Sequence, residues 1–121
     1  MSNRAERTRL RKLRRLQEQA NRRANRTHRL THSGRPQAAR IWLEEVGVSS
    51  ETAKRFASAF SLGVQPTEIG TTEIKTHPHS RFTKTVPVKR YDRTTFLARL
   101  RQYRPKDPTA AIEFDRAAAA Y

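Results

Sequence analysis

Residues 36–63, PQAARIWLEEVGVSSETAKRFASAFSLG, carry the pattern of two short amphipathic helices joined by a tight turn. Apolar residues recur at three- and four-residue intervals on both sides of Gly47, as one buried face on each helix requires. Gly47 stands where a helix takes a left-handed C-terminal cap, and Ser49 or Ser50 can cap the second helix. We therefore expect a helical hairpin, begun by Pro36 in a first helical turn, inside a mainly α domain.

The turn reads GVSSETAKR from Gly47 to Arg55, and residues 39–56 resemble the helix-turn-helix of lac-repressor-type regulators. In that family the Gly allows the sharp turn, the Ser caps the second helix, and the first residues of that helix face base edges. The resemblance implies binding to duplex DNA. Carried over to this sequence, its candidate DNA contacts are Ser49, Ser50, Thr52 and Arg55, and Lys54 beside them is a further candidate.

Two other interpretations of the same residues stay open. They also resemble a helix-hairpin-helix, whose hairpin amides hold a phosphate without reading sequence. The helix-turn-helix pattern usually has Ala or Gly where this chain has Leu43, and Ser49 replaces the second Gly of a helix-hairpin-helix. The third interpretation is an ordinary helical hairpin in which Lys54 and Arg55 are simply solvated.

Positive charge is concentrated in two parts of this 121-residue chain, which has a net charge of +15. Residues 1–35 hold 12 basic and 2 acidic residues, and residues 81–106 hold 9 basic and 1 acidic residue. Such segregated charge attracts a polyanion, because each neutralised phosphate releases a condensed counterion. We therefore expect a nucleic-acid partner, with DNA favoured over RNA, and no membrane partner.

Residues 1–35 are expected to form an arginine-rich arm, helical or disordered, ahead of a small domain at 36–121. From residue 3 to residue 29 there is no Gly or Pro, and helix-forming residues dominate. Like charges four residues apart oppose the free helix, so we expect it to order fully on phosphate. The arm resembles the arginine-rich peptides that enter RNA grooves. Its candidate contacts are Arg7, Arg11, Lys12, Arg14, Arg15, Arg22, Arg23 and Arg26.

The C-terminal half is expected to hold a loop at 63–79 with a short extended piece around Glu73–Lys75, one extended segment at 81–91 and two further helices. The extended segment can pair with the loop before it, as a short β element in a small hairpin or wing. The extended segment alternates β-branched and basic residues, and Pro87 restricts it to a sheet edge or a wing. Asp92 and Asp107 are suited to cap the helices. The last helix is expected to pack on the core or on a second copy in a homodimer. The candidate contacts in this half are Lys89, Arg90, Arg93, Arg101 and Arg104.

Enzymatic chemistry is not expected. The chain has no Cys, its acidic residues are scattered, and it has no Gly-rich phosphate loop or nucleophile motif. His77 and His79 flank Pro78, but no third ligand accompanies them, so we expect no metal and no cofactor. No apolar run approaches the roughly 20 residues that span a bilayer.

The sequence thus predicts a non-enzymatic protein that binds duplex DNA, as a transcription regulator or a mobile-element accessory protein. A cytoplasmic or nucleoid-associated location fits that function. Two alternatives remain. The first is an RNA-binding or ribonucleoprotein-assembly protein that uses the arm as its main contact. The second is a structural adaptor whose basic tail docks on an acidic protein.

Overall fold

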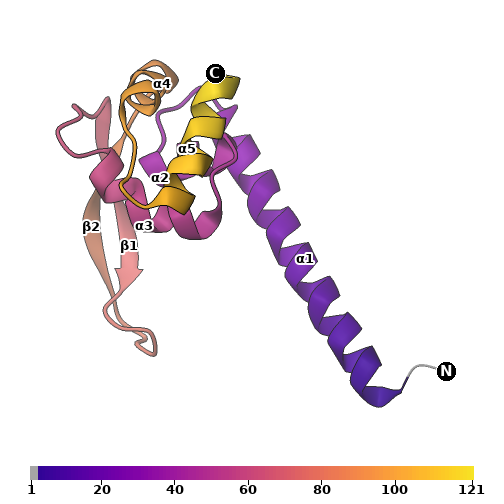
Figure 1. Cartoon of the computed structure of the whole chain (residues 1–121). Coiled ribbons are helices and arrows are strands. Elements are labelled where there is room, and N and C mark those ends of the chain that lie inside the picture. The colour runs from indigo at the N-terminus through magenta and orange to yellow at the C-terminus, as the bar shows by residue number, and fades with distance from the viewer. Residues whose placement is uncertain (1–2) are drawn as a thin grey trace.

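The computed structural model describes residues 3–121, in which four helices surround a small core, and a fifth, long helix and a two-stranded sheet project from it (Figure 1). The mainly α class expected from the sequence is confirmed. The elements in chain order are α1 (Arg4–Thr31), α2 (Ala39–Glu45), α3 (Ser50–Phe60), β1 (Glu68–Lys75), β2 (Thr83–Arg90), α4 (Arg93–Gln102) and α5 (Pro108–Ala120).

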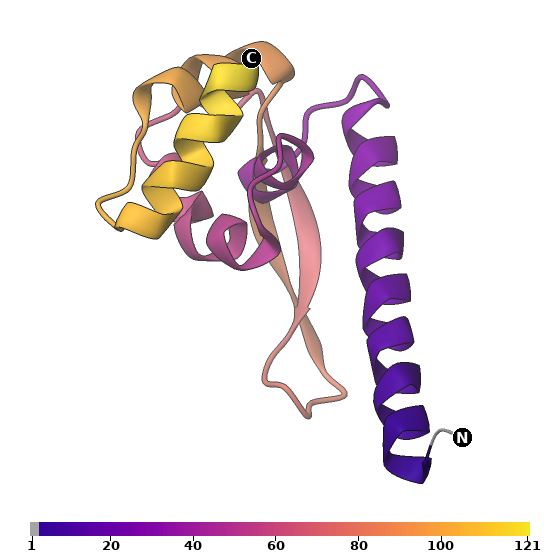
Figure 2. The ribbon, with the colours of Figure 1, turned by 45° about the vertical axis from the view of Figure 1, so that its right-hand side comes forward.

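Helix α1 is a single 28-residue helix that extends away from the rest of the chain (Figures 1 and 2). The side chain of Asn3 caps its start by accepting a 2.8 Å hydrogen bond from the amide of Glu6. Only its last turns meet the domain, where Thr27 and Thr31 are buried against α2. Gly34, with φ of 78°, then reverses the chain toward α2. The structure thus shows the arm as one continuous helix.

The central hairpin of α2 and α3 forms as the sequence predicts, with Gly47 at φ 98° in the turn and Ser49 as the N-cap of α3. The expectation that Pro36 lies in a first helical turn is wrong. The residue after it, Gln37, instead makes an isolated antiparallel bridge with Tyr91, with N–H···O distances of 3.0 and 2.8 Å. This bridge keeps the segment before α2 extended, so the helix starts only at Ala39.

The core lies between the central hairpin and α4 with α5. Its largest members are aromatic, and the indole N–H of Trp42 donates a 2.8 Å hydrogen bond to the carbonyl of Tyr91. Leu43 and Phe114 are fully buried. The rings that contact one another across the core are Trp42, Phe56, Phe60, Phe96, Tyr103 and Phe114.

Caps set the starts of the last two helices, as the sequence predicts. Asp92 accepts from the amide of Thr95 at 2.8 Å, and Asp107 accepts from the amide of Thr109 at 2.9 Å. Hydrogen bonds from backbone amides lower the pKa of both carboxyls, because those bonds favour the ionised form.

The β-hairpin confirms the short β element, and it corrects the expectation that most of residues 63–79 are a loop. Strands β1 and β2 pair antiparallel over eight residues each, from Glu68 opposite Arg90 to Lys75 opposite Thr83. Strand β1 lacks an alternating apolar face and is almost wholly exposed, so its own pattern gave little sign of a strand. Pairing with β2 is what makes it one.

Candidate nucleic-acid interface

One side of α1 is basic along its whole length. At roughly 100° of rotation per residue, eight arginines fall on the same half of the helix. The small and apolar side chains between Leu13 and Thr31 fall on the other half, and Thr27 and Thr31 bury that half against α2. The basic face therefore points away from the domain. Its arginines are Arg4, Arg7, Arg11, Arg14, Arg15, Arg22, Arg26 and Arg29.

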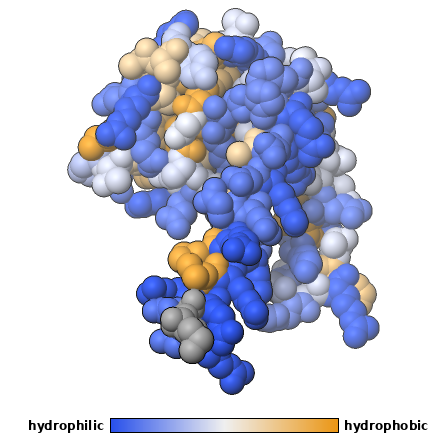
Figure 3. All heavy atoms as spheres, turned by 90° about the vertical axis from the view of Figure 1, so that its right-hand side faces the viewer, coloured by the Kyte–Doolittle hydropathy of each residue, from blue (hydrophilic) through white to orange (hydrophobic). Residues whose placement is uncertain are grey.

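These guanidinium groups are available to a ligand. All eight side chains are exposed, and none has an acidic partner among residues 3–121. In the view of Figure 3, the visible surface of the arm is mostly hydrophilic. The exposed fractions of Leu10, Leu13 and Leu16 are 55%, 55% and 52%, so their stripe is not packed against the domain. Arg4 and Arg29 also belong to this face, although they are not among the candidate contacts predicted from the sequence. Projecting residues 4–31 onto a helix could have identified them.

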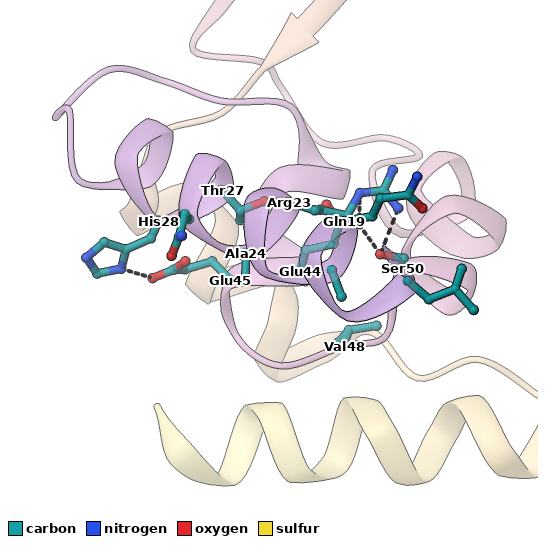
Figure 4. A pocket seen from close by; sticks show the side chains of 12 residues that line it. Gln19, Arg23, Ala24, Thr27, His28, Glu44, Glu45, Val48 and Ser50 are labelled. Carbon is teal, nitrogen blue, oxygen red and sulfur yellow. Dashed lines mark hydrogen bonds and ion pairs between the residues drawn. The ribbon is translucent and has the colours of Figure 1, made fainter. Parts of the chain in front are cut away.

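Arg23 has a different environment from the other arm candidates. Its guanidinium lies 3.8 Å from the Glu44 carboxylate and 3.2 Å from the Ser50 hydroxyl, where α1 crosses α2 and α3 (Figure 4). These residues line a groove of about 910 Å³ that lies between the helices. Arg23 therefore attaches the arm to the domain, whereas Lys12 near the middle of the arm is exposed.

The start of α3, which the helix-turn-helix resemblance would place on DNA, is hydrogen-bonded to Glu113 of α5. Ser49 donates its amide to the Glu113 carboxylate at 2.9 Å, and the Thr52 hydroxyl donates to the same carboxylate. The bond from Thr52 is the main cause that lowers the pKa of Glu113. A carboxylate thus occupies the position where a base edge or phosphate would approach the helix N-terminus.

The other candidate DNA contacts at α3, Ser50 and Arg55, are bonded to different acidic residues of this chain. Ser50 donates to Glu44 at 2.7 Å, and Arg55 pairs with Asp107 at 3.1 Å and lies over the ring of Phe56. Only the Lys54 side chain makes no hydrogen bond or ion pair with another described residue. The structure therefore does not gather these candidates on one free surface.

Three arginines in α4 and just after it contact α5 and the residue that follows α5. Arg101 donates to the backbone carbonyl of Tyr121 at 3.2 Å, Arg104 pairs with Asp115, and Arg93 lies 5.9 Å from the centre of the Tyr121 ring. Each of these three guanidinium groups therefore has a partner within the chain itself.

The β-hairpin carries a second group of exposed cations. Lys89 is exposed on β2, whereas the guanidinium of Arg90 lies over Gly70 and pairs with Glu68 at 3.3 Å. The segment from residue 75 to residue 84 around the hairpin tip contains no acidic residue. Its exposed cations, which the sequence reasoning had not selected, are Lys75, Arg81 and Lys84.

Comparison with known proteins identifies no relative: no family model, no curated protein and no solved structure matches this chain. Across residues 3–121, no helix combines the length and the apolarity needed to cross a bilayer.

Proposed function

We propose that this protein binds nucleic acid without catalysis, with duplex DNA as the favoured ligand and the basic face of α1 as the main contact. The observation that supports this most strongly is the position of the eight arginines. They lie on one side of an exposed helix, turned away from the domain and without acidic partners. Arginine suits this role, since its planar guanidinium makes bidentate contacts with phosphate and with guanine.

The shape of the arm supports duplex DNA over duplex RNA. A helix with its side chains is about 10–12 Å across, which fits the roughly 12 Å major groove of B-DNA. The major groove of A-form RNA is deep and narrow and does not admit side chains in this way. Residues 4–22, which lie beyond the contacts with α2, span about 28 Å, close to one turn of B-DNA.

The β-hairpin supports the proposal as a second arm. It projects from the domain toward the same side as α1 (Figures 1 and 2), and its tip carries Lys75, Arg81 and Lys84. A duplex held on α1 would meet further positive charge there. We do not assign base reading to α3, because Glu113 and Glu44 engage the hydroxyls at its start.

Fluorescence anisotropy tests the proposal with three labelled ligands of equal length: duplex DNA, hairpin RNA and a single strand. Each is titrated with the full chain at several salt concentrations. We expect the duplex DNA to bind most tightly, with an affinity that falls steeply as salt rises. Tighter binding of the RNA would support the ribonucleoprotein alternative, and no salt-dependent binding to any ligand would refute the proposal.

A further inference from the structure

Three side chains that can ligate a metal meet where the arm joins the domain. His28 lies in the last turn of α1, His32 caps its C-terminus, and Glu45 is the last residue of α2. One potential ligand atom from each lies within 4.8 Å of the other two. Nδ1 of His28 is 3.6 Å from the Glu45 carboxylate, as Figure 4 shows, and Nδ1 of His32 is 3.9 Å from it.

The two histidines are spaced for shared coordination. Residues four apart lie on the same face of a helix, which is the spacing by which paired histidines bind zinc in helical motifs. Their ring centroids are 3.9 Å apart. A metal ion binds both rings in their neutral form.

A backbone contact orients His32 for this role. Its Nδ1 lies 2.9 Å from the carbonyl oxygen of His28. A carbonyl oxygen only accepts hydrogen bonds, so this contact places the ring hydrogen on Nδ1. The lone pair of the neutral ring is then on Nε2, so His32 would bind a metal through Nε2 and not through the Nδ1 atom that lies 3.9 Å from Glu45. Metal-ligating histidines usually donate their other ring N–H in the same way, to a carbonyl or a carboxylate.

From this geometry we propose that His28, His32 and Glu45 bind one divalent transition-metal ion, and that zinc is the best fit. Two imidazoles and one carboxylate match the ligands of zinc sites that keep a fourth position open to water. Ligand atoms on a tetrahedral zinc at about 2.0–2.1 Å lie roughly 3.3 Å apart. The side chains of His28 and His32 are 63% and 58% exposed, so rotation about their side-chain bonds can close the remaining distance.

The ion would clamp the arm to the domain. Apart from the Arg23 contacts, α1 is held by the burial of Thr27 and Thr31 and by a 3.0 Å hydrogen bond that the side-chain amide of Gln37 donates to the Leu30 carbonyl. A metal joining α1 to Glu45 adds a link between α1 and α2, and so fixes the direction in which the arm leaves the domain. This site stands independently of the proposed nucleic-acid binding.

Isothermal titration calorimetry with zinc tests the site on the untagged full chain after chelator treatment. We expect one zinc ion per chain and at least a tenfold loss of affinity in each of His28→Ala, His32→Ala and Glu45→Gln. Circular dichroism checks that each variant keeps its helices. The double variant His77→Ala/His79→Ala removes the other two of the chain's four histidines and should bind zinc like the wild type.

Cobalt provides a second, spectroscopic readout that reports on the coordination geometry. Co²⁺ bound to two imidazoles and a carboxylate in a tetrahedral site absorbs visible light strongly, and we expect this absorbance in the wild type and not in His32→Ala. The proposal is overturned if the wild type binds no zinc, or if the three single variants bind it as tightly as the wild type. Loss of binding in His77→Ala/His79→Ala alone would overturn it too.

Discussion

Neutralising three arginines on the basic face of α1 should flatten the salt dependence of DNA binding. The variant is Arg7→Gln/Arg11→Gln/Arg14→Gln, whose three side chains are exposed and lie within a narrow strip of the helix. Glutamine is nearly as good a helix former as arginine, and the change removes repulsion between charges three and four residues apart. We therefore expect α1 to stay helical, so that any effect on binding comes from lost contacts.

The expected size follows from counterion release. Each lost phosphate contact reduces the slope of log K against log salt by about 0.9 on duplex DNA, so three contacts reduce it by about 2.7. Between 50 and 200 mM salt, the affinity of the variant should then fall about 40-fold less than that of the wild type. Fluorescence anisotropy over that range measures both slopes.

A matched control removes the same charge elsewhere. Lys54→Gln/Lys106→Gln/Arg116→Gln takes three exposed cations from α3, the α4–α5 connection and α5. Figure 2 shows that connection on the side of the domain away from α1. We expect the control to keep the wild-type slope. Equal flattening in both triple variants would refute the reasoning, since it would mean that overall charge matters and the position on α1 does not.

The other predictions concern stability and the arm. Residues 23–121 alone should stay folded, because this fragment keeps the buried Thr27, and thermal unfolding checks this. The fragment should lose most of its affinity for DNA, because residues 1–22 carry a net charge of +6, and anisotropy measures that loss. Leu43→Ala should lower the free energy of unfolding by about 2–5 kcal/mol in urea titrations, since Leu43 is fully buried. Tyr91→Phe should keep or raise that free energy, by up to about 1 kcal/mol, because the buried Tyr91 hydroxyl has no partner among the described residues; a clear loss in urea would contradict this. Hydrogen bonding lowers the pKa of Glu113 below its ordinary value of 4.5. The ionised carboxylate therefore stabilises the fold at pH values above 4.5, and this stabilisation is lost as the pH falls through the lowered pKa. The free energy of unfolding of Glu113→Gln should accordingly be about 1 kcal/mol lower than that of the wild type at neutral pH. Urea titrations should show that this difference becomes smaller below pH 4.5.

Local signals in the sequence predicted most of the helices. The caps at Ser49, Asp92 and Asp107 and the glycine at position 47 each act within a few residues, so their effect can be seen in the chain itself. The same is true of the long α1, which has no Gly or Pro.

Contacts between distant residues could not be predicted in this way. Strand β1 exists because β2 pairs with it, and the late start of α2 depends on a bridge between Gln37 and Tyr91. In the candidate site too, local features could be predicted from the sequence and contacts between distant residues could not. The arginines of α1 are exposed as expected, but Glu113 comes from a helix more than 60 residues after Ser49, and no local pattern indicated that its carboxylate bonds to the start of α3.

Nuclear magnetic resonance of the ¹⁵N-labelled full chain, titrated with a duplex of about two helical turns, tests the central claim most directly. If the basic face of α1 is the main contact, the largest amide shift changes should fall within residues 4–26, with smaller ones at the hairpin tip between residues 75 and 84. Changes centred on residues 49–55, with α1 unaffected, would contradict the account and favour a DNA-reading helix at α3.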